Sequence, residues 1–323
     1  NGMSIEKELL AIRQHPIHGV CFDGKQKPPR RTPYSLEVSA GNVSLEGLSE
    51  IWSLKDSGER YTSTVRLFKS PTQHILSVDC EGRGHFCFYN DRLVIDWCSK
   101  GTGPSHYLQT LGLSLYLELR GHLCLHANTM VNNDNAFLFL APSRTGKSTL
   151  TTAMTSRGYS LTTDDMACIY EEKQGYCVYP SWPKVRLWPD SEAYLNDSMS
   201  FDKSGTKKVH ERFAKHEIVL RDAGSEKAAK VKGLYFLRRE ENYTGKTKIT
   251  LMPTSKAMIL LLQNSMLGDA YKSLGIDKTR FTRLADLIKN VPVFEVLYPS
   301  GLEHLEAVCA DIHDDLKHEA FLG

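Results

Sequence analysis

Hydrophobic and polar positions alternate in short segments over the first hundred residues. Segments 34–39, 61–68 and 74–80 carry apolar residues at about every second position, which is the period of a half-buried strand. Segment 84–97 predicts two strands joined by a turn at its central Asn-Asp pair. This pattern predicts a β-rich N-terminal domain over residues 1–102, to which we assign recognition of a substrate.

The apolar period changes after residue 103. Residues 105–122 carry leucines at helical spacing, and residues 123–131 predict a strand. Residues 136–142 form a continuous apolar run of the kind found in a sheet that is covered on both faces. Segment 147–158 predicts a helix closed by its final glycine, and segment 159–165 predicts the next strand. These segments predict a β-α-β unit with a right-handed crossover.

The remaining pattern is also a mixture of helices and strands. Strands are predicted over 232–240, 247–253 and 292–299. Helices are predicted over 255–266 and 279–290 and along most of the chain after residue 301. We therefore expect a second, α/β domain over residues 103–323.

Composition narrows the class of protein. The chain has 323 residues, of which 41% are hydrophobic and 24% charged, so neither a disordered chain nor a fibre is indicated. A net charge of +2 argues against a protein that coats nucleic acid. The eight cysteines form no Cys-x-x-Cys pair, and no apolar run approaches the roughly 20 residues of a membrane span. We expect a cytoplasmic protein without nucleic-acid or membrane partners, and homo-oligomer formation stays open.

The stretch from Ala141 to Ser148, read APSRTGKS, matches the phosphate-loop (Walker A) pattern with alanine at the first glycine position. It follows an apolar strand and opens a helix, which is the context that phosphate binding requires. Lys147 would reach the β- and γ-phosphates, and the Ser148 hydroxyl would sit on Mg²⁺. The nucleotide-binding set is Ser143, Arg144, Thr145, Gly146, Lys147, Ser148 and Thr149. The cofactors implied are Mg²⁺ and ATP or another nucleoside triphosphate.

Two aspartates close the strand after the phosphate loop. Asp164 and Asp165 lie 17 and 18 residues after Lys147. A carboxylate at this position is the usual second holder of Mg²⁺, and a pair suits transfer to a hydroxyl group. We assign Asp164 to the metal and Asp165 to the acceptor's proton. The structural alternative is a turn or helix-capping role.

His126 lies 21 residues before Lys147 in the segment LHANTMV. Together with the phosphate loop, the Arg157-Gly158 helix end and the aspartate pair, this segment resembles the catalytic domain of HPr kinase/phosphorylase. The resemblance covers about residues 104–165 and extends to a broader group that includes kinases of lasso and other ribosomally made peptides and free-serine kinases. Residues 179–191 resemble that group's segment after the aspartates.

The resemblance implies a phosphate-loop domain of the HPr kinase and phosphoenolpyruvate carboxykinase type. It also implies Mg²⁺-nucleotide binding and phosphoryl transfer to a serine or threonine hydroxyl, with His126 near the reacting phosphate. Carried over to this chain, the catalytic set is Asp165, Asp164, His126 and Lys147. The arginine-glycine signature that follows the aspartates in HPr kinases is missing, and the N-terminal region differs. HPr is therefore not the expected acceptor.

Further cations could contact the substrate or its phosphate. Arg186 sits between two apolar residues, and a buried arginine needs a partner. The basic stretch 202–216 contains Lys207, Lys208 and Arg212, and for any single residue in it a solvated loop is the preferred interpretation. We expect an ATP-dependent kinase of peptide or protein Ser/Thr hydroxyls, with a natural-product peptide as one candidate acceptor. The alternatives are a nucleotide-binding regulator with little or no transfer and a free-serine kinase.

Overall fold

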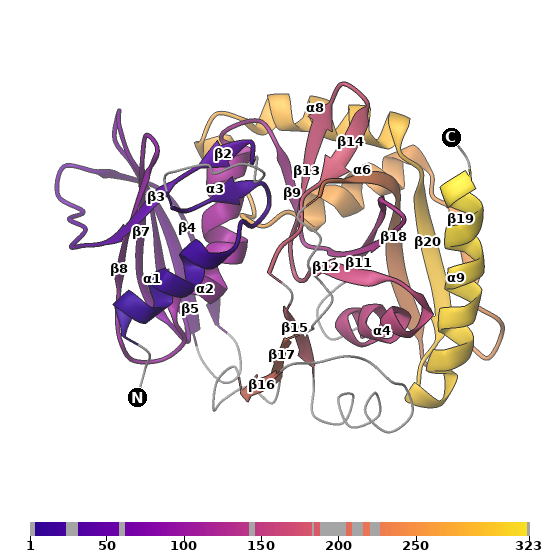
Figure 1. Cartoon of the computed structure of the whole chain (residues 1–323). Helices are drawn as coiled ribbons and strands as arrows, with labels where there is room; N and C mark the ends of the chain where they lie inside the picture. The colour runs from indigo at the N-terminus through magenta and orange to yellow at the C-terminus, as the bar shows by residue number, and fades with distance from the viewer. Residues whose placement is uncertain are drawn as a thin grey trace. The chain divides into compact units, whose positions relative to one another are not determined.

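The chain divides into two compact units in the computed structural model (Figure 1). The structure describes residues 4–23, 32–57, 62–141, 146–182, 184–187, 205–208, 216–219 and 227–321. The first unit contains the described residues up to Gly121 together with Met266–Arg280. The second contains the described residues from His122 to Ser265 and those from Phe281 onward.

In the described part of the first unit, a six-stranded sheet has the strand order β3-β8-β7-β6-β5-β4. The β3–β8 pair is parallel and the other neighbours are antiparallel. The strands are β3 (Glu37–Ala40), β4 (Ser49–Ser57), β5 (Thr62–Lys69), β6 (His74–Asp79), β7 (Arg83–Tyr89) and β8 (Arg92–Trp97). The strands predicted over residues 61–97 are confirmed. Two short strands, β1 (Val20–Cys21) and β2 (Tyr34–Ser35), pair separately.

One face of this sheet is buried against helices of the same unit. Leu67, Leu76 and Phe86 form a cross-strand row with no exposed surface. The helices are α1 (Ile5–Gln14), α2 (Pro104–Tyr107), α3 (Leu113–Glu118) and α7 (Ala270–Ser273), with a π-helical turn at Leu108–Gly112. Aromatic rings join the layers, as in Phe88 on Tyr116 with centroids 5.8 Å apart.

The first unit extends beyond the boundary at residue 102 that the sequence pattern predicts. The helical segment after Gly103 belongs to it because its apolar side packs on the N-terminal sheet. The insertion at 266–280 is also tied to this unit. The Trp52 indole N–H donates to an Asp269 carboxylate oxygen at 2.6 Å, and Arg280 pairs with Glu118 at 2.9 Å.

Among the described residues of the second unit, a nine-stranded mixed sheet runs in the order β12-β10-β11-β18-β14-β13-β9, with β20 beside β18 and β19 beside β20. Its strands are β9 (Leu123–Leu125), β10 (Asn128–Asn132), β11 (Asn135–Leu140), β12 (Ser160–Thr163), β13 (Ala167–Glu172), β14 (Gly175–Val178), β18 (Ala229–Glu240), β19 (Lys248–Leu251) and β20 (Val293–Pro299). The strand predicted over 123–131 is in fact two strands, because β9 pairs with β13 whereas β10 pairs with β11.

The predicted β-α-β unit is present. Helix α4 (Lys147–Met154) follows β11 and leads through a 3₁₀ turn (Thr155–Arg157) to β12, and Gly158 closes the helical segment with φ 88°. Strand β10 lies between β11 and β12 and is antiparallel to both, so β11 and β12 run in the same direction. The end of β11 that leads into the predicted phosphate loop and the end of β12 that leads into the aspartates therefore lie at the same edge of the sheet.

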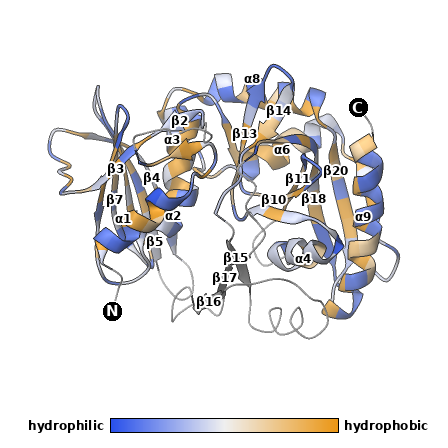
Figure 2. Ribbon diagram, in the orientation of Figure 1, coloured by the Kyte–Doolittle hydropathy of each residue, from blue (hydrophilic) through white to orange (hydrophobic). Residues whose placement is uncertain are grey.

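Helices cover both faces of this sheet, as the apolar run before the phosphate loop predicts. On one face, Phe137 and Phe139 of β11 pack with α4 and with α9 (Leu305–Phe321). On the other, Leu138 packs with α6 (Thr254–Gln263) and α8 (Asp277–Asn290). A 3₁₀ turn (Leu302–His304) precedes α9. Figure 2 shows hydrophobic and hydrophilic residues alternating along α9, as expected for a helix with one buried face.

Three short strands form a separate antiparallel sheet in the order β15-β17-β16. They are β15 (Lys184–Leu187), β16 (Gly205–Lys208) and β17 (His216–Val219). No disulfide joins any of the eight cysteines, all of which lie in described ranges. In the part of the chain that the structure describes, every helix is too short or too polar to cross a membrane.

Candidate functional site

The N-terminus of α4 forms the centre of the candidate site. Gly146 precedes the helix with φ 86° and ψ 14°, a left-handed conformation that is inexpensive only for glycine. Its carbonyl accepts the first helical hydrogen bond, from the Leu150 N–H at 2.9 Å. The amide groups at such a helix start attract anions. The predicted nucleotide contacts Ser143, Arg144 and Thr145 lie outside the described residues.

Lys147 and His126 are brought together by the fold. The Lys147 ammonium nitrogen lies 3.1 Å from His126 Nδ1, and the lysine side chain is largely buried. Because an ammonium group can only donate, Nδ1 is the acceptor of this hydrogen bond. His126 occupies the break between β9 and β10, where its backbone N–H donates to the Asn264 carbonyl at 2.7 Å. His126 is therefore held in position to orient Lys147.

Ser148 and Asp164 offer two oxygen ligands side by side. The Ser148 hydroxyl donates to Asp164 Oδ1 at 3.3 Å, and Thr149 in the same helical turn is buried. Mg²⁺ is commonly held by one or two protein oxygens together with substrate phosphates and waters. The residues present fit that arrangement. The described ranges contain no cluster of three or more His, Cys, Asp and Glu side chains that could hold a metal ion.

Asp165 has a strained backbone. Its φ is 66°, a left-handed value that is uncommon outside glycine and that costs of order 1–3 kcal/mol for a non-glycine residue. Its N–H donates to Asn128 Oδ1 at 3.0 Å. Such strain clusters at functional sites, where the surrounding structure imposes it. The chain bends at Asp164 and Asp165, directly after β12.

Asn128 is a site residue that the sequence analysis did not find. It is fully buried at the start of β10, and its amide nitrogen donates to the Thr151 hydroxyl at 3.0 Å and toward the Ser148 hydroxyl at 3.5 Å. One side chain thus links the Asp165 turn to the first turns of α4. The signal in the sequence was an asparagine inside the segment 123–131, which was predicted as a strand.

The other predicted cations are only partly described. Arg186 lies in β15, a strand that runs beside α4, and Lys207 and Lys208 lie in β16 of the same small sheet. Arg212 lies outside the described residues. The backbone therefore places Arg186 in the neighbourhood of the phosphate-loop helix, and its role stays a prediction.

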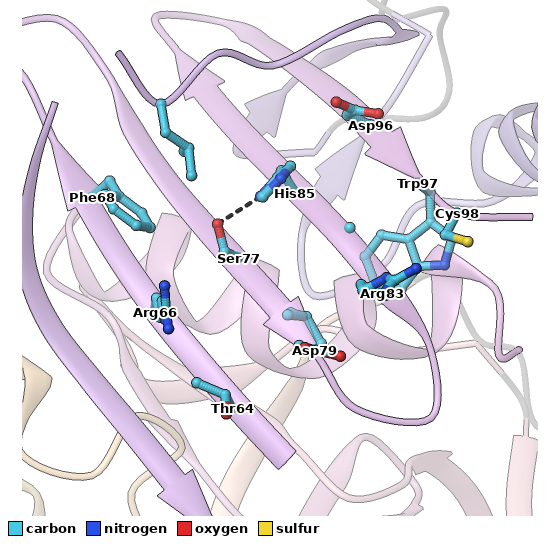
Figure 3. Close-up of a pocket in the computed structure, with 13 residues that line it drawn as sticks. Thr64, Arg66, Phe68, Ser77, Asp79, Arg83, His85, Asp96, Trp97 and Cys98 are labelled. Carbon is cyan, nitrogen blue, oxygen red and sulfur yellow. Dashed lines mark hydrogen bonds between the residues drawn. The ribbon is translucent and has the colours of Figure 1, made fainter. Parts of the chain in front are cut away.

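A second candidate site lies in the first unit, on the polar face of its sheet (Figure 3). Arg66, Ser77, His85 and Asp96 form one row across β5, β6, β7 and β8. The Ser77 hydroxyl lies 2.6 Å from His85 Nδ1, and Asp96 accepts the Val43 N–H at 3.0 Å. The cavity has a volume of about 460 Å³, and its lining also includes Thr64, Phe68, Asp79, Arg83, Trp97 and Cys98.

Strand alternation predicted a polar face here, but it could not predict that the face is hollowed. The volume suits a small ligand or a short stretch of peptide. Guanidinium, imidazole, hydroxyl and carboxylate groups all reach the hollow, and Phe68 adds an aromatic ring. A hydrogen bond from the Lys100 backbone lowers the pKa of the Cys98 thiol, and a hydrogen bond from the Arg83 side chain lowers it further by a smaller amount. The chemistry favours a polar, charged ligand.

Comparison with known proteins does not establish a family. No family model matches the chain, and no curated protein matches it. Among solved structures, the HPr(Ser) kinase/phosphatase from Coxiella burnetii is similar over 61% of this chain and 93% of that chain, with a TM-score of 0.33 and 16% identity. This likeness is too distant to support an argument about fold or activity. Membership of the HPr kinase-like group stays a prediction.

Proposed function

We propose that the second unit is a Mg²⁺-dependent kinase that transfers the γ-phosphoryl group of ATP to a serine or threonine hydroxyl. The observation that carries the proposal is the grouping of Lys147, Ser148 and the Asp164–Asp165 turn at the start of α4. A lysine, a hydroxyl and a carboxylate at the start of a helix are the elements that phosphoryl transfer requires.

Mg²⁺ would be held by Ser148 and Asp164 and would neutralise charge on the phosphate oxygens. Lys147, oriented by His126, and the N-terminal amides of α4 would bind the phosphate chain. The acceptor oxygen forms a bond to the γ-phosphorus while the bond from that phosphorus to the bridging oxygen breaks, and ADP leaves. Asp165 accepts the hydroxyl proton.

The first unit would select the acceptor by binding it in the cavity of the N-terminal sheet. We infer a peptide or protein acceptor, because the cavity offers separate charged and aromatic groups along neighbouring strands. Arg83→Gln should raise the KM for the acceptor without changing the Kd for nucleotide. Arg92→Gln is a matched control, since Arg92 is exposed on β8 and does not line the cavity. Equal acceptor KM values for the two variants would argue against this role.

The central test is intact-mass spectrometry of candidate acceptors after incubation with Mg-ATP. Serine-ended peptides, free serine and HPr would each be run beside Lys147→Ala and Asp165→Asn. A phosphoryl mass gain on one acceptor that disappears in Lys147→Ala would establish a kinase and its acceptor class. Asp165→Asn should lose the product while its nucleotide affinity stays nearly intact, because asparagine tolerates a left-handed backbone.

Two outcomes would redirect the proposal. If nucleotide binds and stays intact with every acceptor, the chain is better explained as a nucleotide-binding regulator. If free serine alone gains mass, the reaction stands and the acceptor is a small molecule.

A further inference from the structure

Arg239 lies where β18 reaches the N-terminus of α4. Strand β18 runs parallel to β11 with Leu140 opposite Phe236, so it continues past the last residue of β11 along the edge where the phosphate loop begins. A methyl group placed on Gly146 would lie 3.2 Å from Arg239 Nη1. The guanidinium group therefore lies close to the residue that precedes α4.

The neighbouring arginine faces the opposite way. Tyr235 and Leu237 pack in the cluster formed with α4 and α9, and strand alternation places Arg239 next on that same face. Arg238 faces the other side, where it contacts Glu240 at 2.8 Å and Glu295 at 3.5 Å. Two adjacent residues of the same type thus have separate surroundings, which provides an internal control.

The site favours an anion for three separate reasons. The Arg239 guanidinium lies beside Gly146, Lys147 is the first residue of α4, and the positive end of the helix dipole lies at the same point. A guanidinium is planar and presents several donors to phosphate oxygens at once, whereas an ammonium acts as a compact point charge. Arg239 is an exposed residue that pairs with Tyr298 on β20, so its backbone is held by that strand.

We propose that Arg239 binds the phosphate chain of the nucleotide beside Lys147. The inference rests on the proposed function, because it takes the anion at α4 to be a nucleoside triphosphate. Arg239 comes from a strand about ninety residues further along the chain than the phosphate loop, and it supplies donors from the side of β18.

The test measures equilibrium binding by calorimetry at constant ionic strength, with Mg-ATP and adenosine as the probes. We expect Arg239→Gln to weaken Mg-ATP binding roughly 10- to 100-fold, the range for a lost hydrogen bond to a charged group. Arg239→Lys should fall between this variant and the wild type, because it keeps the charge and loses the fork of donors. Arg238→Gln should bind Mg-ATP as the wild type does, and adenosine affinity should not differ among the variants.

Mg-ATP affinity of Arg239→Gln within twofold of the wild type would overturn the inference. An equal loss in Arg238→Gln would overturn it as well, since it would indicate a general effect on β18. Circular dichroism of each variant checks folding. If Arg239→Gln misfolds, the Mg-ATP affinity of Arg239→Lys still tests the contribution of the guanidinium group. Failure of the proposed function has a different signature: the wild type and Lys147→Ala would bind Mg-ATP equally weakly.

Discussion

Asn128 accepts the backbone N–H of Asp165 at 3.0 Å while Asp165 holds a left-handed φ of 66°. The amide group of the same asparagine donates to Thr151 in α4. A single buried side chain therefore connects the aspartate turn, whose backbone is strained, to helix α4. The geometry of the candidate base depends on a residue outside the recognised motif.

The strain at Asp165 predicts an order of stability among its variants. Asp165→Gly should be at least as stable as the wild type, because glycine adopts a positive φ freely. Asp165→Ala should lose about 1 kcal/mol or more, since a Cβ is disfavoured there and alanine has no polar side chain to compensate. Urea unfolding of the variants measures the difference. Equal stability of the glycine and alanine variants would mean that the turn relaxes.

Asn128→Ala should lower both stability and transfer. The change removes the Asn128 acceptor of the Asp165 N–H, which costs about 1–3 kcal/mol, whereas the Thr151 hydroxyl keeps its hydrogen bond to the Lys147 carbonyl at 3.0 Å. It also releases the turn that orients Asp165, so kcat should fall more than nucleotide affinity. Unfolding curves and separate kcat and Kd measurements check this. Unchanged kcat in a folded Asn128→Ala protein would show that the asparagine does not position the turn.

The Glu118–Arg280 pair should behave as a buried ion pair. The two side chains are almost completely buried, and the Arg280 guanidinium also lies 4.0 Å from the Tyr271 ring. Removing one partner, as in Glu118→Gln, should cost about 3–5 kcal/mol because it leaves a buried charge uncompensated. The double variant Glu118→Leu, Arg280→Met should cost much less than the sum of its single changes.

An exposed ion pair provides a control for the variants of the buried Glu118–Arg280 pair. Lys227 and Asp134 lie 3.1 Å apart with most of both side chains exposed, so their removal should cost less than about 1 kcal/mol. Similar losses for the two pairs in denaturant unfolding would contradict the buried-pair interpretation.

His18 predicts a loss of stability in acid. Burial lowers its pKa from 6.5 to about 4. The folded state therefore prefers neutral histidine, and the stabilisation is complete above pH 6.5 and is lost as the pH falls through the folded pKa. The shift corresponds to roughly 3 kcal/mol. His18→Asn, which tolerates the positive φ at this position, should show a smaller decrease between these two pH values.

Asp315 on α9 should change the pH dependence of stability in the opposite direction, so that its contribution falls as the pH rises. Burial raises its pKa above the ordinary 3.8, and burial followed by the Asp315 charge raises the pKa of Glu319. A raised carboxyl pKa gives a contribution that is complete below pH 3.8 and is lost as the pH rises through the folded value. Asp315→Asn should therefore lose less unfolding free energy than the wild type between about pH 4 and pH 7. Parallel pH profiles of the two proteins would exclude this contribution.

Local sequence was sufficient to predict most of the elements. The alternating segments became β5 to β8, the apolar run became β11, and the segment after Gly146 became α4. The spacing of apolar residues and the positions of turn-forming residues reflect interactions between near neighbours in the chain. They can therefore be read from the sequence without knowledge of the fold. The motif likewise proposed Lys147 and Ser148, and the end of the next predicted strand proposed the aspartate pair; these site assignments stay predictions.

Long-range pairing decided what the sequence left undetermined. The apolar residues from Leu123 to Val131 read as one strand, yet the chain breaks at His126 because the two halves pair with different strands. The boundary at residue 102 was placed too early because the partners of the following helix, Phe88 and Arg280, are not its sequence neighbours.

The sequence by itself determined most of the helices and strands and the chemical groups of the predicted phosphate loop. Only the tertiary structure decided which other groups meet them: Asn128 behind the aspartate turn, Arg239 against Gly146, and the cavity on the N-terminal sheet. The physical reason is that secondary structure follows from interactions between residues close in sequence. A site depends on side chains that pack together from distant strands, and no local pattern records those contacts.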